Sequence, residues 1–262
     1  DQIKVYKANQ IIPQIAENCV PGGVSRLPSL CPCCGSPLVI RESSGGTRQL
    51  YCDNKGCPAK LVRKFKHFCS KTRMGIEGLS ELTLEKFIRH GWIRNYGDLF
   101  LLEQHRETII ATPGFGEKSF ARLQKAIDKR RTCHLNEFIA ALGIPEVGRH
   151  AGRILNTHFH GSWTQFEQAI KDNFDFTQLT DFGQIMHDNI YTWYADVENA
   201  KLWRPALDHI TFMEEETMST TTEARPNPFY GKTVVATGKL INYTRDEIQN
   251  KLLTLGAKPT GS

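Results

Sequence analysis

The chain has 262 residues, with 33 lysines and arginines against 28 aspartates and glutamates and a formal net charge of +5 at neutral pH. This length allows two or more domains with buried cores, and the small positive excess means that partners must be inferred from where the basic residues lie. No apolar run reaches the length of about 18 residues that a membrane-spanning helix needs. The opening segment "DQIKVYKANQ" lacks the apolar core of a signal peptide. We therefore expect a cytoplasmic protein without a membrane partner.

The first residues alternate apolar and polar side chains around Ile3 and Val5, and a short second strand is expected after "IIP". Two strands are too few to form a stable sheet alone. The start of the chain therefore reads as the end of a larger β-fold.

Eight cysteines are present, and five of them lie close together in the sequence: Cys31, Cys33, Cys34, Cys52 and Cys57. Four of the five form two pairs with the spacing C-x2-C-x17-C-x4-C, which suits tetrahedral Zn²⁺. Gly35 can take a positive φ to close the turn after the first pair, and Cys33 should point away from the metal. A disulfide framework is the poorer interpretation, because the chain is neither short nor visibly secreted. Four thiolates leave no open coordination position, so we predict a structural zinc held by Cys31, Cys34, Cys52 and Cys57.

The segment 58–73 has a basic face and no acidic residue; its cations are Lys60, Arg63, Lys64, Lys66, Lys71 and Arg73. Leu61, Phe65 and Phe68 recur at helical spacing, which predicts an amphipathic helix. Such a charge run is often only a solvated surface. Next to a zinc module we favour a surface that faces phosphates, with Lys60, Arg63 and Lys64 as contacts.

Farther along, helix signals are interrupted at intervals of roughly 35 residues by a turn with a small or polar, an apolar and a small residue. The four turns are Gly78-Leu79-Ser80, Gly114-Phe115-Gly116, Glu146-Val147-Gly148 and Asp181-Phe182-Gly183. Each is expected to join two helices, with its middle residue packed between them. Trp163, Trp193 and Trp203 are interpreted as helix-packing residues.

Small residues in these turns would allow a nucleic-acid phosphate to approach the backbone, and the next helix would direct its free N–H groups at the same anion. Such contacts carry no sequence information. Only the second turn has both glycines: Ser80 weakens the first turn, Glu146 the third and Asp181 the fourth, where a carboxylate would repel phosphate. We expect the second and third turns to contact DNA and the others to be partly architectural. The predicted contacts are Gly78, Ser80, Gly114, Gly116, Lys118, Val147, Gly148 and Arg149.

Residues 217–228 are polar and contain proline, which is typical of a linker. After them, Thr233–Ala236 predicts a buried strand that ends at Thr237 and Gly238. Thr244 is expected to cap an amphipathic helix on Ile248, Leu252 and Leu255, so that the chain closes with one β-α unit.

This order of motifs resembles the C-terminal half of bacterial NAD⁺-dependent DNA ligases. "KANQIIPQI" is similar to the closing strand of that family's oligonucleotide-binding (OB) fold, from which Asn9 and Gln10 depart. "ALGIPEVG" is similar to its third helix-hairpin-helix motif, and "FYGKTVVATGKL" to the first strand of its BRCT domain. The resemblance implies the following layout: the end of the OB fold in 1–27, a four-cysteine zinc finger in 28–60, four helix-hairpin-helix motifs in 61–216, the linker in 217–228, and the N-terminal part of a BRCT domain in 229–262.

The resemblance implies a mainly α chain, with a tandem helix-hairpin-helix domain between a small zinc finger and a truncated α/β unit. It implies that this chain grips nicked double-stranded DNA as a monomer, near the bacterial nucleoid, for an adenylation domain of the same ligase that uses NAD⁺ and Mg²⁺. The adenylation motif K-x-D-G and the dinucleotide signature G-x-G-x-x-G are both absent from the sequence. We therefore expect no catalytic residues and no activity from this chain alone.

Two alternatives remain open from the residues. A repair nuclease with paired hairpins would need a cluster of acidic metal ligands, and "MEEE" (213–216) is better explained as a solvated helix end. A non-catalytic DNA-repair scaffold would need a whole BRCT unit, with Thr237 and Gly238 in a phosphopeptide pocket.

Overall fold

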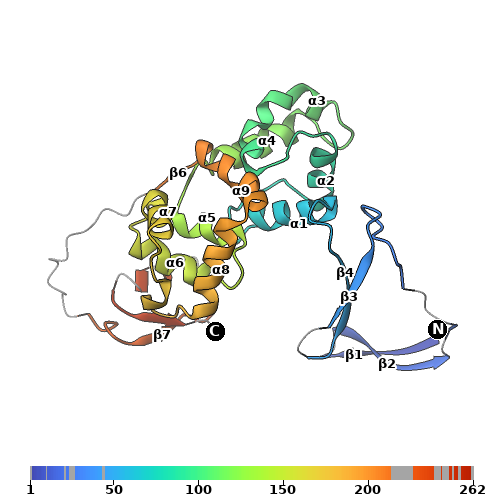
Figure 1. Ribbon diagram of the computed structural model, residues 1–262, viewed down its shortest axis with the longest axis horizontal. Coiled ribbons are helices and arrows are strands. Elements are labelled where there is room, and N and C mark those ends of the chain that lie inside the picture. Colours follow the sequence, from blue (N-terminus) through green and yellow to red (C-terminus); the bar gives the residue numbers. More distant parts are fainter. Residues whose placement is uncertain are drawn as a thin grey trace. The chain divides into compact units, whose positions relative to one another are not determined.

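The computed structural model describes residues 2–9, 11–20, 22–23, 27–42, 45–213, 227–238, 243, 248–249, 251–252 and 255–260. The chain divides into two compact units, Asp1–Glu215 and Glu216–Ser262. The described part is mainly helical and contains small two-stranded sheets (Figure 1). Within it, no helix combines the length and apolar character needed to cross a membrane.

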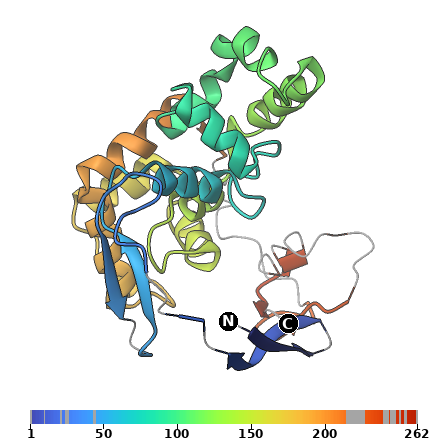
Figure 2. The same ribbon diagram turned by 90° about the vertical axis from the view of Figure 1, so that its right-hand side faces the viewer.

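Two narrow antiparallel hairpins open the first unit (Figure 2). β1 (Gln2–Ala8) pairs with β2 (Ile12–Val20), and almost every residue of this hairpin is exposed. β3 (Leu38–Glu42) pairs with β4 (Arg48–Cys52). A two-stranded ribbon cannot bury its own side chains, so neither hairpin has a core of its own.

The rest of the first unit is built from helices. The α-helices are α1 (Pro58–Cys69), α2 (Glu81–Arg89), α3 (Arg106–Ile110), α4 (Glu117–Asp128), α5 (Leu135–Leu142), α6 (Arg149–His158), α7 (Trp163–Lys171), α8 (Gln184–Ala195) and α9 (Val197–Trp203). The 3₁₀ segments are η1 (Tyr96–His105), η2 (Phe176–Gln178) and η3 (Arg204–His209).

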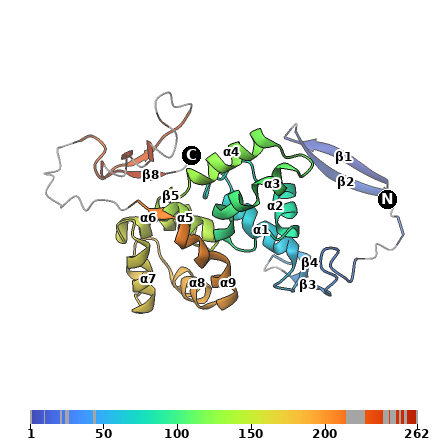
Figure 3. The same cartoon turned by 90° about the horizontal axis from the view of Figure 1, so that it is seen from above.

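Helix α1 lies between α2–α4 and α5–α9 (Figures 1 and 3). On its apolar face Phe65 and Phe68 are fully buried and Leu61 is half-buried. Phe65 and Phe68 both contact Tyr96, and the rings of Phe68 and Tyr96 stack with centroids 4.0 Å apart. The Tyr96 hydroxyl donates to the Lys64 carbonyl at 3.3 Å, which satisfies the polar end of this buried ring. Burial of an aromatic side chain contributes about 1.5–3 kcal/mol, so α1 is an anchor for both groups of helices.

A short parallel strand pairing connects the segment after the last helices to the middle of the chain. β5 (Thr132–Cys133) pairs with β6 (Thr211–Phe212), with Thr132 opposite Thr211. Phe212 then packs edge-to-face on Phe138. As predicted, Trp163, Trp193 and Trp203 are buried packing residues.

The predicted helix before the fourth turn is replaced by the three-residue segment η2. Asn173, with φ of 56°, stops α7, and the Asp175 carboxylate accepts from the Thr177 backbone N–H at 2.9 Å. This short-range bond competes with continuation of the helix.

In the second unit, β7 (Thr233–Val235) pairs in parallel with β8 (Lys258–Thr260), a strand that the sequence reading missed. Val235 is 46% exposed, so the predicted buried strand is half-covered in the described part of this unit. Helical backbone is described at Ile248–Gln249 and Lys251–Leu252. Thr244, most of the predicted linker and all of "MEEE" except Met213 lie outside the described residues.

The contact between η1 and η3 generates a stability prediction. A Cβ atom on Gly97 would stand 2.6 Å from the Pro205 carbonyl oxygen, and neither backbone segment can yield easily. Gly97→Ala should lower the free energy of unfolding by about 1–3 kcal/mol, as overpacking does. Urea denaturation followed by tryptophan fluorescence measures this change.

Gly23→Ala is the matched control, because the added methyl group meets no described atom within 4 Å. An unchanged unfolding midpoint for the Gly97 variant would show that this close approach does not constrain the fold.

Candidate metal centre and nucleic-acid interface

The four thiols that the spacing selects lie together. The sulfur atoms of Cys31, Cys34, Cys52 and Cys57 are all within 4.8 Å of one another. The Sγ–Sγ distance is 4.0 Å between Cys31 and Cys57 and 3.5 Å between Cys34 and Cys52. A tetrahedral site with Zn–S bonds of about 2.3 Å separates its sulfurs by about 3.8 Å. The donor set and its size therefore suit a metal ion such as structural zinc.

Three local structures bring these thiols together. After Cys31 the chain turns through Gly35, whose φ is 69° and whose N–H donates to the Cys31 carbonyl at 2.8 Å. Cys52 ends β4. Cys57 is the N-cap of α1, so the metal centre continues directly into the helix. Cys33 is exposed and lies outside the cluster, as expected.

The pKa values of three of these thiols are shifted, in opposite directions. Hydrogen bonds from Ser36 lower the pKa of the Cys34 thiol to about 6, so it is a thiolate at neutral pH. Burial instead raises the pKa of Cys57 to about 12 and also raises the pKa of Cys52. A bound metal ion reverses this effect of burial, because a coordinating thiol loses its proton to the metal.

The four turns share one backbone conformation despite their different sequences. Their first residues, Gly78, Gly114, Glu146 and Asp181, have φ of 94°, 90°, 62° and 62°. In three of them the middle residue donates its N–H to the carbonyl three positions earlier, at 2.9 Å for Phe115, 3.1 Å for Val147 and 3.2 Å for Phe182. Glu146 and Asp181 therefore occupy a conformation that glycine adopts more easily.

The third residue of each turn is the N-cap of a helix: Ser80 for α2, Gly116 for α4, Gly148 for α6 and Gly183 for α8. Val147 and Phe182 are buried, whereas Leu79 and Phe115 are half-buried. A Cβ atom at Gly116, Gly148 or Gly183 would meet no described atom within 4 Å. An external group can therefore approach these helix starts, beside which Lys118 and Arg149 lie exposed.

Side-chain bonds join the turns in pairs, which sequence reasoning missed. Lys86, the sixth residue of α2, donates to the Pro113 carbonyl of the second turn at 2.9 Å. Asn189, the sixth residue of α8, donates to the Pro145 carbonyl of the third turn at 3.1 Å. In the sequence, the only feature that could have indicated these two bonds is the proline directly before the first residue of the second and third turns.

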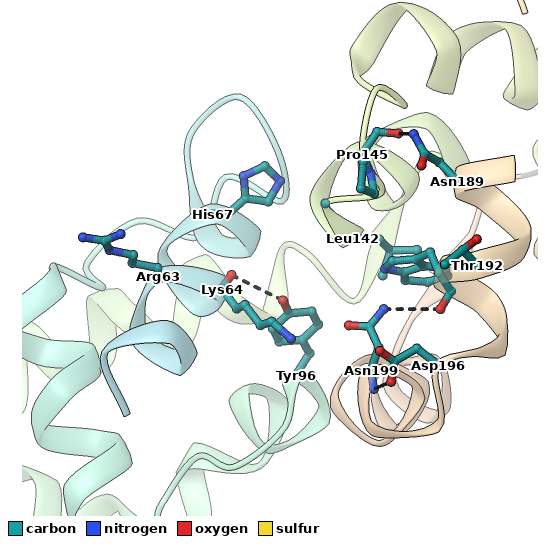
Figure 4. Close-up of a pocket in the computed structure, with 12 residues that line it drawn as sticks. Arg63, Lys64, His67, Tyr96, Leu142, Pro145, Asn189, Thr192, Asp196 and Asn199 are labelled. Carbon is teal, nitrogen blue, oxygen red and sulfur yellow. Dashed lines mark hydrogen bonds between the residues drawn. The ribbon is translucent and has the colours of Figure 1, made fainter. Parts of the chain in front are cut away.

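The cations on the basic face of α1 have different surroundings. Lys66 forms an ion pair with Glu81. Arg63 and Lys64 line a cleft of about 470 Å³, where Lys64 faces Asn199 of α9 and Arg63 points away from that wall (Figure 4). Lys60 and Lys64 line a second cleft of about 500 Å³. The three residues of α1 predicted to contact phosphate therefore line clefts and do not belong to the turns. Gly143 and Pro145, just before the third turn, also line the first cleft.

The structure defines a mainly helical protein with a four-thiol cluster of the kind that holds a metal ion. Comparison with known proteins narrows this class. Over its whole length the chain is 36% identical to a DNA ligase of Lachnoclostridium phytofermentans, of which it spans 39%. It is 34% identical to a DNA ligase of Ruminiclostridium cellulolyticum, spanning 39%, and 35% identical to one of Symbiobacterium thermophilum, spanning 38%. No protein-family model matches the chain.

This similarity over the whole chain to proteins named DNA ligase confirms the resemblance to DNA ligases that the order of its motifs indicates. It spans about two fifths of the length of these curated relatives.

The cysteine cluster generates a metal prediction. The chain should bind one metal ion, and Cys52→Ser should abolish this binding because three thiolates hold Zn²⁺ far less tightly. Cys33→Ser, which changes an exposed thiol outside the cluster, should leave it intact. Elemental analysis of the purified chains measures the stoichiometry.

Acid should release the metal, because protons compete with the metal ion for the four thiolates. Equal metal content in the Cys52→Ser and Cys33→Ser chains would contradict the assignment of the four clustered cysteines as metal ligands.

Proposed function

We propose that this chain is the DNA-gripping part of an NAD⁺-dependent DNA ligase, which closes on nicked duplex DNA by contacts to the phosphate backbone. Ligation in replication and repair then needs the adenylation domain of the same full-length protein, where NAD⁺ and Mg²⁺ act. The contribution of this chain to the rate is positioning, because it holds the nick in register for a separate active site. The layout proposed from the family resemblance, from OB-fold end to partial BRCT domain, belongs to this hypothesis.

One observation carries the proposal: the second and third turns present uncapped helix starts with a cation beside them. Gly116 and Gly148 have no side chain to cover the first N–H groups of α4 and α6. Lys118 and Arg149 extend beside these helix starts. A phosphate there would meet both helix N–H groups and a positive charge, whatever the base sequence.

The turns are not equivalent in this function. In the fourth turn the Asp181 carboxylate lies 2.9 Å from the imidazole Nε2 of His150, the second residue of α6. The third turn also carries a carboxylate, Glu146, but Arg149 follows it at the start of α6, whereas α8 after Asp181 contains no lysine or arginine. The fourth turn is therefore expected to support the third rather than to bind DNA. Gly78 and Ser80 of the first turn add weaker contacts, because the Ser80 hydroxyl already caps α2 by accepting from Thr83 N–H at 3.1 Å.

The metal centre fits a structural role in the same function. Four thiolates leave zinc no open position for substrate, so the ion would fix the β3–β4 hairpin against the start of α1. Among the described residues, cysteines form the only cluster of possible metal ligands, which disfavours a nuclease with an acidic metal site.

Carboxylates placed at the helix starts test the DNA contacts. Gly116→Asp and Gly148→Asp should each weaken binding to a nicked duplex at least about tenfold, because the new charge meets the phosphate. Aspartate is a good N-cap, and the extended backbone at both positions accepts any residue, so the fold is retained. Fluorescence anisotropy at several salt concentrations measures the affinity.

Gly183→Asp is the matched control, as it adds the same cap to α8 in the fourth turn. It should leave the affinity nearly unchanged. Equal losses in all three variants would refute the ranking of the turns, and strong dependence of wild-type binding on base sequence would refute backbone recognition.

The missing adenylation motif generates a second functional prediction. Incubated with NAD⁺ and Mg²⁺, the chain alone should form no covalent adduct with AMP and should seal no nick. Mass spectrometry of the intact chain and a gel assay on nicked DNA measure the two outcomes. An adduct would show that the chain holds an adenylation site of its own.

A further inference from the structure

A carboxylate lies at the start of α4, where the proposed function places a phosphate. Glu117 is the first residue of this helix and directly follows the N-cap Gly116. Its side chain is 60% exposed, so an external anion at the helix start would meet its charge. An acid at this position stabilises the helix by opposing the positive end of its dipole, but it also repels a phosphate. The two effects conflict unless another group neutralises the carboxylate.

Arg106 supplies that group. It is the first residue of α3, the helix before the second turn, and its guanidinium donates a hydrogen bond to the Glu117 carboxylate. The Nε atom of Arg106 also lies 3.6 Å from a carboxylate oxygen of Glu103. Because Glu117 is held in an ion pair, its charge does not cancel that of Lys118, the next residue of α4.

The same arrangement recurs at the first turn. Glu81 is the first residue of α2, and the Lys66 ammonium of α1, the helix before that turn, donates to its carboxylate. By contrast, α6 begins with Arg149 and α8 with Gln184, and the first turns of these two helices contain no acidic residue. Of the four helices that follow the turns, the two that begin with an acid each receive a cation from the helix before the turn.

Folding stability alone gives this ion pair little importance. The Arg106 and Glu117 side chains are both exposed, and water and salt screen such pairs so that they contribute little to folding. A phosphate at the open N–H groups of α4 would be a direct neighbour of Glu117. Neutralisation of this carboxylate therefore affects phosphate binding more than it affects the fold.

We propose that Arg106 is a positioning residue for DNA binding, which holds the Glu117 carboxylate in an ion pair so that the start of α4 accepts a phosphate. Arg106 acts through Glu117 and does not itself contact the DNA. This inference rests on the proposed DNA-binding function and adds to it the residue that makes the second turn electrostatically suited to an anion.

The test is a double-mutant cycle on the whole chain, with fluorescence anisotropy of a labelled nicked duplex as the measurement. Arg106→Gln should weaken binding about fivefold, because it leaves the Glu117 charge unpaired beside the phosphate. Glu117→Gln should bind slightly more tightly than the unchanged chain. R106Q/E117Q should regain the affinity of the unchanged chain to within about twofold, although it still lacks the arginine.

Lys171→Gln is the matched control. It removes one cation from an ion pair with Glu167 on α7, a helix that follows none of the four turns, and it should keep the affinity within about twofold. Added salt should shrink the loss caused by Arg106→Gln, since it screens the repulsion between exposed charges. A loss caused by a disturbed fold would instead appear as a lower urea midpoint and would not be relieved by Glu117→Gln.

The possible outcomes separate the two proposals. Failure of the unchanged chain to bind the nicked duplex would refute the proposed function. Binding that Arg106→Gln leaves unchanged, or that Lys171→Gln weakens equally, would overturn only the role of Arg106. An equal loss in R106Q and R106Q/E117Q would show that the arginine acts on the DNA directly, and it would also overturn positioning through Glu117.

Discussion

The burial of the apolar face of α1 is the interaction on which the other parts depend. Cys57 belongs to the thiol cluster and is also the residue at which α1 begins. About two and three helical turns later, Phe65 and Phe68 enter the core against Tyr96. A metal centre built on a two-stranded hairpin has little core of its own, so this covalent continuity is what ties it to the helices.

The turns of the helical region repeat one backbone conformation. The positive φ of the first residue reverses the chain, and the extended third residue starts the next helix at a fixed angle. Glycine is tolerated at both places, but Glu146 shows that the conformation persists without it. The bonds from Lys86 and Asn189 then link neighbouring turns in pairs. Rigid presentation lowers the entropic cost of binding a long, regular ligand such as a DNA backbone.

The local distribution of charge is compatible with the proposed binding of a phosphate backbone. Among the described residues Lys60 and Arg94 form no ion pair, whereas Lys66 and Arg106 are paired with Glu81 and Glu117. Because the net charge is only +5, this local arrangement matters more than the total.

The sequence by itself determined the ligand set of the metal centre and the positions of the turns, because both are local: a pair of cysteines or a glycine before a helix acts within a few residues. It also indicated the family through the order of these motifs. Only the tertiary structure decided which turns pair, that Lys64 faces Asn199 across a cleft, and that β5 meets β6. These contacts join residues far apart in the chain, and their partners are chosen by packing of the whole core, which no spacing rule encodes.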